Sequence, residues 1–294
     1  MSGGMIGALI IAYHPPPGQV ESLIDSLRGQ LDQVLVIDNS QPASGIKWAD
    51  NSESTLLEPG TNLGVAEAIN RGVARLANSG CKRVLLLDQD SVPASDLVAG
   101  LARCMDQALG EGRAIAAAGP VIRDQDSGQD APFLRFGLPR NQRLRGSQGS
   151  VSCDFLISSG CLLNLDAWQQ IGPMRSGWFI DNIDLEWSFR ARRQGFELLG
   201  CFDVHLDHAI GETRFLLPGH RLPYRHHGPA RLYTMMRNRL WLYRSGAPWS
   251  WIIRDSLRAA IKFICFSLLV RPRLANAGAM LRGLRDGLVR RPAA

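Results

Sequence analysis

The segment Val84-Leu85-Leu86-Leu87-Asp88-Gln89-Asp90 is an apolar run that ends in two carboxylates. Its four apolar residues predict a buried strand. The carboxylates would then lie at the exposed carboxyl end of that strand, which is where ligands bind in open α/β sheets. The segment therefore predicts a sheet and also the edge of that sheet where chemistry takes place.

The first half of the chain alternates short apolar runs with segments of helical period. Strands are predicted over residues 9–13, 34–37, 55–57, 84–87 and 115–121, and helices over residues 20–27, 65–77 and 95–109. This alternation is typical of parallel strands joined by crossover helices, so we expect an α/β fold. Residues 123–150, rich in Asp, Gln, Gly, Ser and Arg, predict a long surface connection that is mobile until substrate arrives.

The second half is less regular. A strand that passes a small-residue turn is predicted over residues 157–161, and a helix over residues 183–193. The apolar run 198–204 leads to His208. We assign these segments to the same α/β domain, which spans residues 1–228.

Residues 229–294 form a basic C-terminal region, with amphipathic helices predicted over residues 230–243 and 249–270. From Trp251 onward nine Arg or Lys residues stand against two Asp, a local balance of +7, whereas the whole chain carries +6. This asymmetry favours a membrane surface or an anionic lipid-linked substrate as partner. No nucleic-acid-binding motif accompanies the charge, so we expect no nucleic acid partner.

The longest apolar run of this region, residues 263–270, is far short of the roughly 20 residues that cross a bilayer. Interfacial attachment is therefore expected. The same helices would also suit an acceptor lobe or a dimer contact. The apolar stretch Met5 to Tyr13 lacks a preceding basic region and does not resemble a signal peptide. We expect a cytoplasmic protein, peripheral at the inner face of the cytoplasmic membrane.

The six cysteines are scattered, without a CxxC pair. Most lie in apolar runs, as small hydrophobic residues do. The sequence predicts neither a disulfide framework nor a zinc site.

Asp88 and Asp90 repel one another unless a cation lies beside them, and Mg²⁺ or Mn²⁺ holding a diphosphate is a common solution. As an alternative, Asp90 or Ser91 would cap a helix that begins near Pro93. We expect the metal.

Polar residues also follow other predicted strands. The Asp38 carboxylate, followed by Asn39, can accept a hydrogen bond from the imide N–H of a uracil or thymine ring, although Asp-Asn-Ser also suits an ordinary turn. Asn62-Leu63-Gly64 opens a helix whose backbone N–H groups would suit an anion, or which is simply a capped helix. Asn70 lies two turns further along.

Together these motifs resemble bacterial members of glycosyltransferase family 2, and the rhamnosyltransferases among them most closely. The resemblance covers roughly residues 6–240, and the combination is far more specific than any single motif. The motifs are Ile10-Ile11-Ala12-Tyr13, Val36-Ile37-Asp38-Asn39, Asn62-Leu63-Gly64 with Asn70, Leu87-Asp88-Gln89-Asp90-Ser91, Ser158-Ser159-Gly160, Phe179 to Trp187, and His208-Ala209-Ile210-Gly211.

The resemblance implies a GT-A fold, which is a mostly parallel central sheet flanked by helices. It implies nucleotide-sugar contacts at Ala12, Tyr13, Asp38, Asn39, Asn62, Gly64, Asn70, Asp88 and Gln89. Metal ligands are expected at Asp90, Asp88 and His208, with His205 as an alternative to His208, and acceptor contacts at Ser159, Gly160 and Trp187.

Inversion requires a base that takes the proton of the acceptor hydroxyl. Alignment with the family's acidic block puts Asp184 in the place of the base and Glu186 beside it as an orienting neighbour. Ile183 stands where the family commonly has its first acid, which leaves Asp181 as a rival. Three carboxylates on the first turn of a helix would also follow from the helix dipole alone.

The resemblance therefore implies transfer of L-rhamnose from dTDP-L-rhamnose to a hydroxyl of a cell-surface oligosaccharide or lipid-linked glycan, such as lipopolysaccharide core, O-antigen or a rhamnan. A UDP-hexose donor is the alternative within the family. A sugar nucleotidyltransferase would need a Gly-rich phosphate loop after the first strand, where Tyr13-His14-Pro15 stands instead. A non-catalytic glycan-binding module would not need Asp88, Asp90 and Asp184 together.

Overall fold

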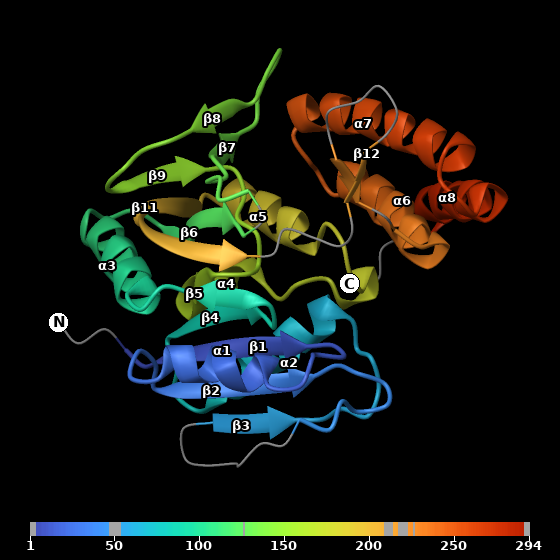
Figure 1. Ribbon diagram of the computed structural model, residues 1–294. Coiled ribbons are helices and arrows are strands. Elements are labelled where there is room, and N and C mark those ends of the chain that lie inside the picture. Colours follow the sequence, from blue (N-terminus) through green and yellow to red (C-terminus); the bar gives the residue numbers. More distant parts are fainter. Residues whose placement is uncertain are drawn as a thin grey trace.

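The computed structural model describes residues 4–46, 54–125, 127–208, 214–216, 223–225 and 227–290, which form an α/β core with a group of C-terminal helices beside it (Figure 1). The strands are β1 Ile6–Ala12, β2 Gln33–Asp38, β3 Ser54–Leu57, β4 Arg83–Asp88, β5 Ser91–Pro93, β6 Ile115–Asp124, β7 Phe133–Arg135, β8 Gln142–Leu144, β9 Ser150–Cys153, β10 Cys161–Asn164, β11 Glu197–His208, β12 Arg214–Leu216 and β13 Pro223–Arg225. The helices are α1 Gln19–Leu27, α2 Val65–Asn78, α3 Leu97–Gly110, α4 Leu165–Ile171, α5 Ile183–Arg193, α6 Pro229–Arg244, α7 Trp249–Leu268 and α8 Arg273–Val289, with a short 3₁₀ helix, η1, at Ser176–Trp178.

The central sheet has nine strands in the order β3-β2-β1-β4-β10-β6-β11-β5, with β9 paired to β11. β1, β2, β3 and β4 pair in parallel, as do β6 and β11. β10 is antiparallel to both β4 and β6, so these two strands run in the same direction. The carboxyl ends of the parallel strands therefore meet at one edge of the sheet.

Two apolar layers cover the sheet because side chains alternate along each strand. Leu9 of β1 packs in the layer that contains α2, α4 and α5. Its neighbours Ala8 and Ile10 pack in the layer that contains α1 and α3. The predicted α/β fold is thus confirmed, and helix and strand ends on both layers position the loops at the carboxyl edge.

Two predicted segments differ in detail. The strand expected over residues 157–161 begins at Cys161, because Gly160 adopts φ +81° in a turn that donates a hydrogen bond to the Leu86 carbonyl. The expected loop 123–150 contains the antiparallel hairpin of β7 and β8. Short strands with few apolar residues carry too weak a pattern to be recognised in the sequence.

The C-terminal region contains three helices where two were predicted. α6 and α8 lie side by side (Figure 1). Gly283 and Gly287 lie one turn apart on α8, directly against backbone atoms of α6. A small apolar core that includes Leu232, Met236 and Phe266 joins the three helices. Within the part of the chain that the structure describes, no helix is long and apolar enough to cross a membrane.

One expectation about the cysteines was wrong. Cys104 on α3 and Cys201 on β11 form a disulfide, with their Cα atoms 6.5 Å apart. The two residues are 97 positions apart in the sequence, and only the packing of α3 on the sheet brings them together. Cys81, Cys153, Cys161 and Cys265 are free and buried, as expected of small apolar residues.

Gly72 provides a test of how α2 packs on the sheet. A Cβ atom at this position would overlap the side chain of Leu9, which is fully buried in β1. Because a packed core cannot give way at low cost, we expect Gly72→Ala to lower the free energy of unfolding by about 1–3 kcal/mol in urea denaturation. The matched control is Gly110→Ala on α3, where nothing lies within 4 Å. Equal stability of the two variants would contradict this packing.

Candidate active site

The register of the parallel strands brings three predicted site residues together. Asp38 is paired with Ala12, and Asp88 is paired with Ile11 on the other side of the same strand. The backbone N–H of Tyr13 donates to Oε1 of Gln89 over 2.6 Å, which ties the loop after β1 to the loop after β4. Ala12, Tyr13, Asp38, Asp88 and Gln89 therefore lie at one edge of the sheet.

Asp38 is buried but held in its charged form. Burial alone would raise the pKa of this carboxyl, yet hydrogen bonds from Ser40 and Ser44 hold it below the ordinary value. The N–H and hydroxyl of Ser44 both donate to Oδ2 over 2.7 Å, and the N–H of Ser40 donates to Oδ1. The carboxylate is thus an oriented acceptor, as recognition of an imide N–H requires.

Asn39 and Asn62 shape the next loop. Oδ1 of Asn39 accepts a hydrogen bond from the Leu63 N–H over 2.8 Å, and Oδ1 of Asn62 accepts one from the Gly64 N–H over 2.9 Å. Gly64 adopts φ +76°, and a Cβ atom there would overlap Phe179. This loop therefore fits closely under the segment that precedes α5.

One interpretation of the sequence expected the backbone N–H groups at the start of α2 to bind an anion. In the structure these groups already have a protein partner. The N–H groups of Val65 and Ala66 both donate to the Phe179 carbonyl, over 2.7 and 3.3 Å. The Phe179 carbonyl, directly after the 3₁₀ helix η1, thus caps the start of α2.

Asn70 was predicted to contact the nucleotide, and the structure gives it another role. Its Nδ2 donates to the Met174 carbonyl over 2.7 Å, and its Oδ1 accepts from the Met174 N–H over 2.9 Å. Nδ2 also donates to the Ser176 hydroxyl. These hydrogen bonds use the amide nitrogen and the amide oxygen, so Asn70 holds the chain before η1.

Asp88, Gln89, Asp90 and Ser91 form the turn between β4 and β5. Ser91 starts β5 and α3 begins only at Leu97, so the alternative role of Asp90 or Ser91 as the cap of α3 was wrong. In the antiparallel pairing of β5 with β11, His208 is the partner of Ser91. Two carboxylates and an imidazole from these elements are a donor set that suits Mn²⁺ or Mg²⁺. The side chain of His208 lies outside the described residues, and no group of three acidic, His or Cys side chains forms among those that are described.

The carboxyl group of Asp184 has a raised pKa. It lies in the first turn of α5, and burial is the main cause that raises its pKa to about 6. The charges of Asp181 and Asp88 act in the same direction, while the hydrogen bond that its Oδ1 accepts from the Leu185 N–H acts against them. The three carboxylates therefore lie within electrostatic reach of one another.

Asp181 precedes α5 in a left-handed conformation with φ +67°. Its Oδ1 lies 3.4 Å from Nη2 of Arg231 on α6, and its Oδ2 has no hydrogen-bond partner within the part of the chain that the structure describes. A non-glycine residue in this conformation is strained, and such strain is common where a loop must present a side chain for function.

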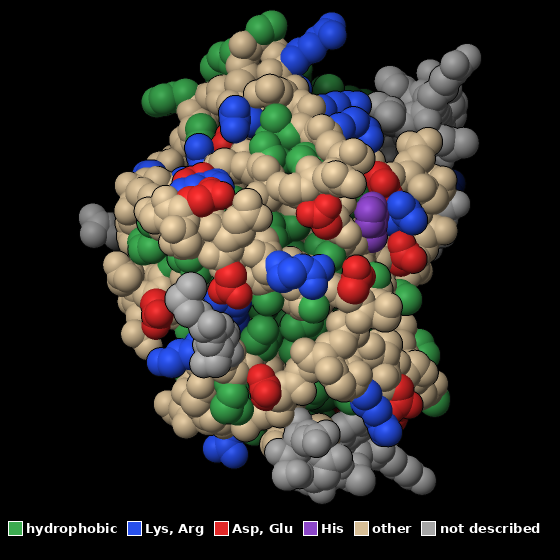
Figure 2. All heavy atoms as spheres, turned by 90° about the vertical axis from the view of Figure 1, so that its left-hand side faces the viewer, with side chains coloured by type: hydrophobic (Ala, Val, Ile, Leu, Met, Phe, Trp, Pro, Cys, Tyr) green, Lys and Arg blue, Asp and Glu red, His purple; other side chains and the backbone are tan. Residues whose placement is uncertain are grey.

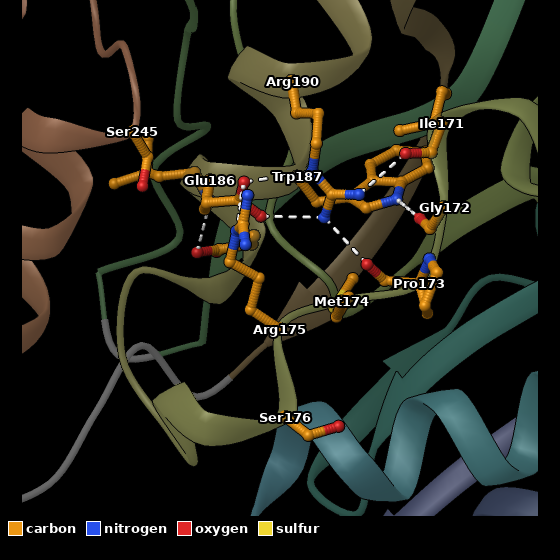
Figure 3. Close-up of polar contacts among 12 residues, drawn as sticks. Ile171, Gly172, Pro173, Met174, Arg175, Ser176, Glu186, Trp187, Arg190 and Ser245 are labelled. Atoms are coloured by element: carbon orange, nitrogen blue, oxygen red, sulfur yellow. Dashed lines mark hydrogen bonds and ion pairs between the residues drawn. The ribbon is translucent and has the colours of Figure 1, made fainter. Parts of the chain in front are cut away.

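Glu186 does not lie beside Asp184 as an orienting group. It is 2% exposed, and its two carboxylate oxygens accept hydrogen bonds from Arg175 and Arg190 (Figure 3). Arg190 also donates to the carbonyls of Ile171 and Pro173, over 2.8 Å each. Glu186 is therefore the centre of an ion-pair cluster that fixes the segment between α4 and α5.

The three residues predicted to contact the acceptor are buried. Trp187 packs against Trp168, and its indole N–H donates to the Gly172 carbonyl. The Ser159 hydroxyl lies 2.7 Å from the Ser91 hydroxyl, beneath the turn after β4. Gly160 is enclosed by Leu206 and Pro120. Residues 158–160 therefore support the carboxylate loop from inside.

Two residues on α6, Arg237 and Asn238, bind the segment that carries Asp181. Asn238 is fully buried, and it donates hydrogen bonds to carbonyls of the segment around Asp181. Arg237 donates to the carbonyls of Gly177 and Trp178. In the sequence, the only sign of this role is that Asn238 is a polar residue within a predicted helix. That sign does not show which segment Asn238 contacts.

Comparison with known proteins relates this geometry to chemistry. The chain is 29% identical over 268 residues to the dTDP-rhamnosyl transferase RfbF of Shigella flexneri, covering 90% of this chain and 86% of that protein. It is 20% identical over 215 residues to the low-salt glycan biosynthesis hexosyltransferase Agl10 of Haloferax volcanii, covering 71% and 69%. No family model matches the sequence.

Solved structures share the fold at low sequence identity. The mannosyltransferase PcManGT of Pyrobaculum calidifontis, with GDP-Man and Mn²⁺, has TM-score 0.52 and 12% identity, covering 98% of this chain and 88% of its own. TarS 1-349 of S. aureus with UDP-GlcNAc has TM-score 0.55 and 12% identity, covering 97% and 80%. GalNAc-T7 with UDP, GalNAc and Mn²⁺ has TM-score 0.58 and 10% identity, and this chain spans only 56% of its length.

Three observations support the same class of enzyme. They are the order of strands in the sheet, the carboxylates at its carboxyl edge and the sequence similarity over 90% of the chain. The protein is a glycosyltransferase with a GT-A fold, and its sequence is similar to that of a dTDP-rhamnosyl transferase.

Proposed function

We propose that this enzyme transfers L-rhamnose from dTDP-L-rhamnose, with inversion, to a hydroxyl of a cell-surface glycan such as lipopolysaccharide core, O-antigen or a rhamnan. The observation that carries the proposal is that Asp88, at the carboxyl end of β4, lies within electrostatic reach of Asp184 in the first turn of α5. One carboxylate belongs to the sheet edge that would hold a nucleotide sugar, and the other has the properties of a base. The name of the Shigella flexneri relative supports the donor.

The donor would bind along the ends of β1, β2 and β4. The Asp38 carboxylate would accept the imide N–H of the thymine ring, and the Tyr13 side chain, 52% exposed, would pack against the base. A UDP sugar has the same imide group, so a UDP-hexose stays the alternative donor, and the hexosyltransferase relative supports it. A glycan-binding module without catalysis is the alternative from another class, and the raised pKa of Asp184 disfavours it.

Asp90, Asp88 and His208 would hold Mg²⁺ or Mn²⁺. When bound, such an ion neutralises the diphosphate as it departs. The residues around it have separate tasks. Gln89 fixes the loop by accepting the Tyr13 N–H, and Ser159 supports the same turn from below through Ser91.

Asp184 would act as the base that takes the proton of the acceptor hydroxyl. A base is most effective when its pKa lies near the working pH, and a pKa of about 6 is much closer to it than the ordinary value for Asp. Asp181 is the rival, since its Oδ2 is buried and has no hydrogen-bond partner among the described residues. Its Oδ1 is already paired with Arg231.

This assignment predicts a pH dependence. Because the base must be ionised, kcat/KM is expected to fall about tenfold per pH unit below about pH 6, which is the pKa of Asp184, and to be constant above it. Asp184→Asn is expected to lower kcat by at least about 100-fold. If kcat/KM still falls at low pH in Asp184→Asn but no longer does so in Asp181→Asn, Asp181 is the base.

The same variants carry an internal control for folding. The folded-state pKa of Asp184 lies above its unfolded value, so its stabilising contribution is present below about pH 4 and is lost as pH rises through about 6. At pH 8 the neutral side chain of Asp184→Asn should therefore let this variant melt no lower than the wild type while its activity is lost. A lower melting temperature would mean that the loss of activity reflects unfolding.

Calorimetric titration tests the donor and the metal together. We expect dTDP-rhamnose to bind more tightly than UDP-glucose or GDP-mannose in the presence of Mn²⁺, and binding to weaken at least about tenfold with EDTA or in Asp90→Asn. Asp96→Asn is the matched control, because Asp96 lies just before α3 and outside the site. Tighter binding of UDP-glucose would show that the proposed donor is wrong. Donor binding that is unchanged by EDTA and by Asp90→Asn would show that no metal is needed.

The exposed face of α7 supports a peripheral position at the cytoplasmic side of a membrane. Large apolar side chains recur there every three or four residues, at Trp249, Ile253, Leu257, Ile261, Ile264 and Leu268, and Trp249 is 78% exposed. Arg254 and Arg258 flank this apolar stripe, and Arg271 and Arg273 follow it. An apolar helix face bordered by arginines suits the headgroup region of an anionic membrane. The side of the molecule shown in Figure 2 differs, because acidic and basic side chains are interspersed over most of it.

Vesicle sedimentation tests this surface. Phosphatidylglycerol vesicles are expected to bind the protein and pure phosphatidylcholine vesicles to bind it at least about tenfold more weakly, because several arginines each add roughly 1 kcal/mol at an anionic surface. The double variant Leu257→Glu/Ile264→Glu should lose binding, whereas Leu57→Glu, which changes an exposed apolar residue of β3, should keep it. A stable dimer that the double variant dissociates would instead make the stripe a contact between two copies of the chain.

A further inference from the structure

The segment from Phe179 to Asn182 leads into the catalytic helix α5 through an unusual backbone. Phe179, Asp181 and Asn182 all have positive φ, at +64°, +67° and +65°. None of them is glycine, so each conformation is disfavoured unless surrounding contacts impose it. The position of Asp181, and of Asp184 two residues after Asn182, therefore depends on what holds this segment.

Most contacts near the start of the segment Phe179 to Asn182 are made by the residues before it. Asn70 fixes Met174 and Ser176, and the cluster of Glu186, Arg175 and Arg190 fixes residues 171–175. The Phe179 carbonyl is bound by the start of α2. None of these contacts reaches the carbonyls of Ile180 and Asp181, which require another partner.

Asn238 supplies that partner from α6. Its Nδ2 donates to the carbonyls of Trp178, Ile180 and Asp181, over 2.8, 2.7 and 3.0 Å. The side chain is 0% exposed, so water cannot replace it without opening the packing between α6 and the loop. Its Oδ1 accepts from Nε of Arg237, which orients the amide so that Nδ2 faces the loop.

Arg237 strengthens the same attachment. Its guanidinium lies 4.3 Å from the ring centroid of Trp241, and Trp241 packs against Trp178 at the start of the segment. The same guanidinium donates to the Gly177 and Trp178 carbonyls. Two consecutive residues of α6 thus bind the carbonyls of Gly177, Trp178, Ile180 and Asp181.

We propose that Asn238 is a positioning residue for glycosyl transfer: it imposes the backbone conformation of residues 178–182 and so sets where Asp181 and Asp184 stand relative to the acceptor hydroxyl. The role of these two carboxylates rests on the proposed function. The α6 helix therefore completes the catalytic site, although Asn238 itself touches no substrate.

The test compares Asn238→Ala with Asn276→Ala. Asn276 is a matched control because it is also buried in the C-terminal helices, where its Nδ2 donates to the carbonyls of Phe266 and Val270. We expect Asn238→Ala to lower kcat by about 100-fold, because a displacement of about 1 Å in the reacting groups has an effect of that order. The donor Kd should change less than about threefold, since the donor residues lie on other loops.

Asn276→Ala should lose a similar amount of thermal stability and keep kcat within about threefold of wild type. Asn238→Ser, which retains one hydroxyl donor, should fold and give an intermediate kcat. Wild-type kcat in Asn238→Ala would overturn the proposal. An equal fall of kcat in Asn276→Ala at the same melting temperature would also overturn it, because the effect would then be one of general stability.

Hydrogen exchange separates this inference from the proposed function. In Asn238→Ala the amides of residues 178–182 should exchange at least about tenfold faster, without any donor present, while Asn276→Ala should leave them unchanged. If wild type proves inactive with dTDP-rhamnose, the donor assignment fails but this comparison still decides the role of Asn238. Unchanged exchange in Asn238→Ala would overturn it.

Discussion

Electrostatic repulsion among Asp88, Asp181 and Asp184 is the constraint that the surrounding structure has to meet. Burial is the main cause that raises the pKa of Asp184, and the charges of Asp181 and Asp88 act in the same direction. A flexible loop would relieve the repulsion by moving apart. Each carboxylate is therefore carried by an element that cannot move easily: Asp88 by an inner strand of the sheet, Asp184 by the first turn of α5, and Asp181 by a segment bound from α2 and α6.

Several polar residues that resemble site residues in fact keep these elements in place. Glu186 is buried between Arg175 and Arg190, and removal of one partner from such a cluster would leave an uncompensated charge in the interior. Asn70 and Asn238 use their amides to satisfy backbone groups of the same connection, which would otherwise be buried without partners. The supporting residues are thus as polar as the residues that face the substrate, and only their partners distinguish them.

The C-terminal helices have two different faces. The inner face of α6 contacts the loop that carries Asp181, whereas the outer face of α7 exposes apolar side chains. The C-terminal helices therefore connect the loop that carries Asp181 with the surface that we propose for the membrane. The helices join both parts through a small core around Phe266 and Met280.

The sequence by itself determined the sheet, most helices and the edge where the carboxylates gather. Runs such as Val84 to Leu87 predict buried strands, and in a parallel sheet the residues that follow such strands meet at one edge. Ala12, Tyr13, Asp38, Asp88 and Gln89 could be grouped for that reason. These assignments depend on local periodicity and on one general rule of topology.

Only the tertiary structure decided which polar residues of the second half face the site. Asp184, Glu186 and Trp187 lie within one turn of α5 but have different surroundings. Asp184 is a carboxyl group with a raised pKa within electrostatic reach of Asp88, Glu186 is the centre of an ion-pair cluster, and Trp187 is a core side chain. A helix turns by about 100° per residue, so neighbours point to different surroundings, and those surroundings come from segments far apart in the sequence. The Cys104–Cys201 disulfide and the contacts of Asn238 have the same origin, because both join residues whose proximity exists only after the layers have packed.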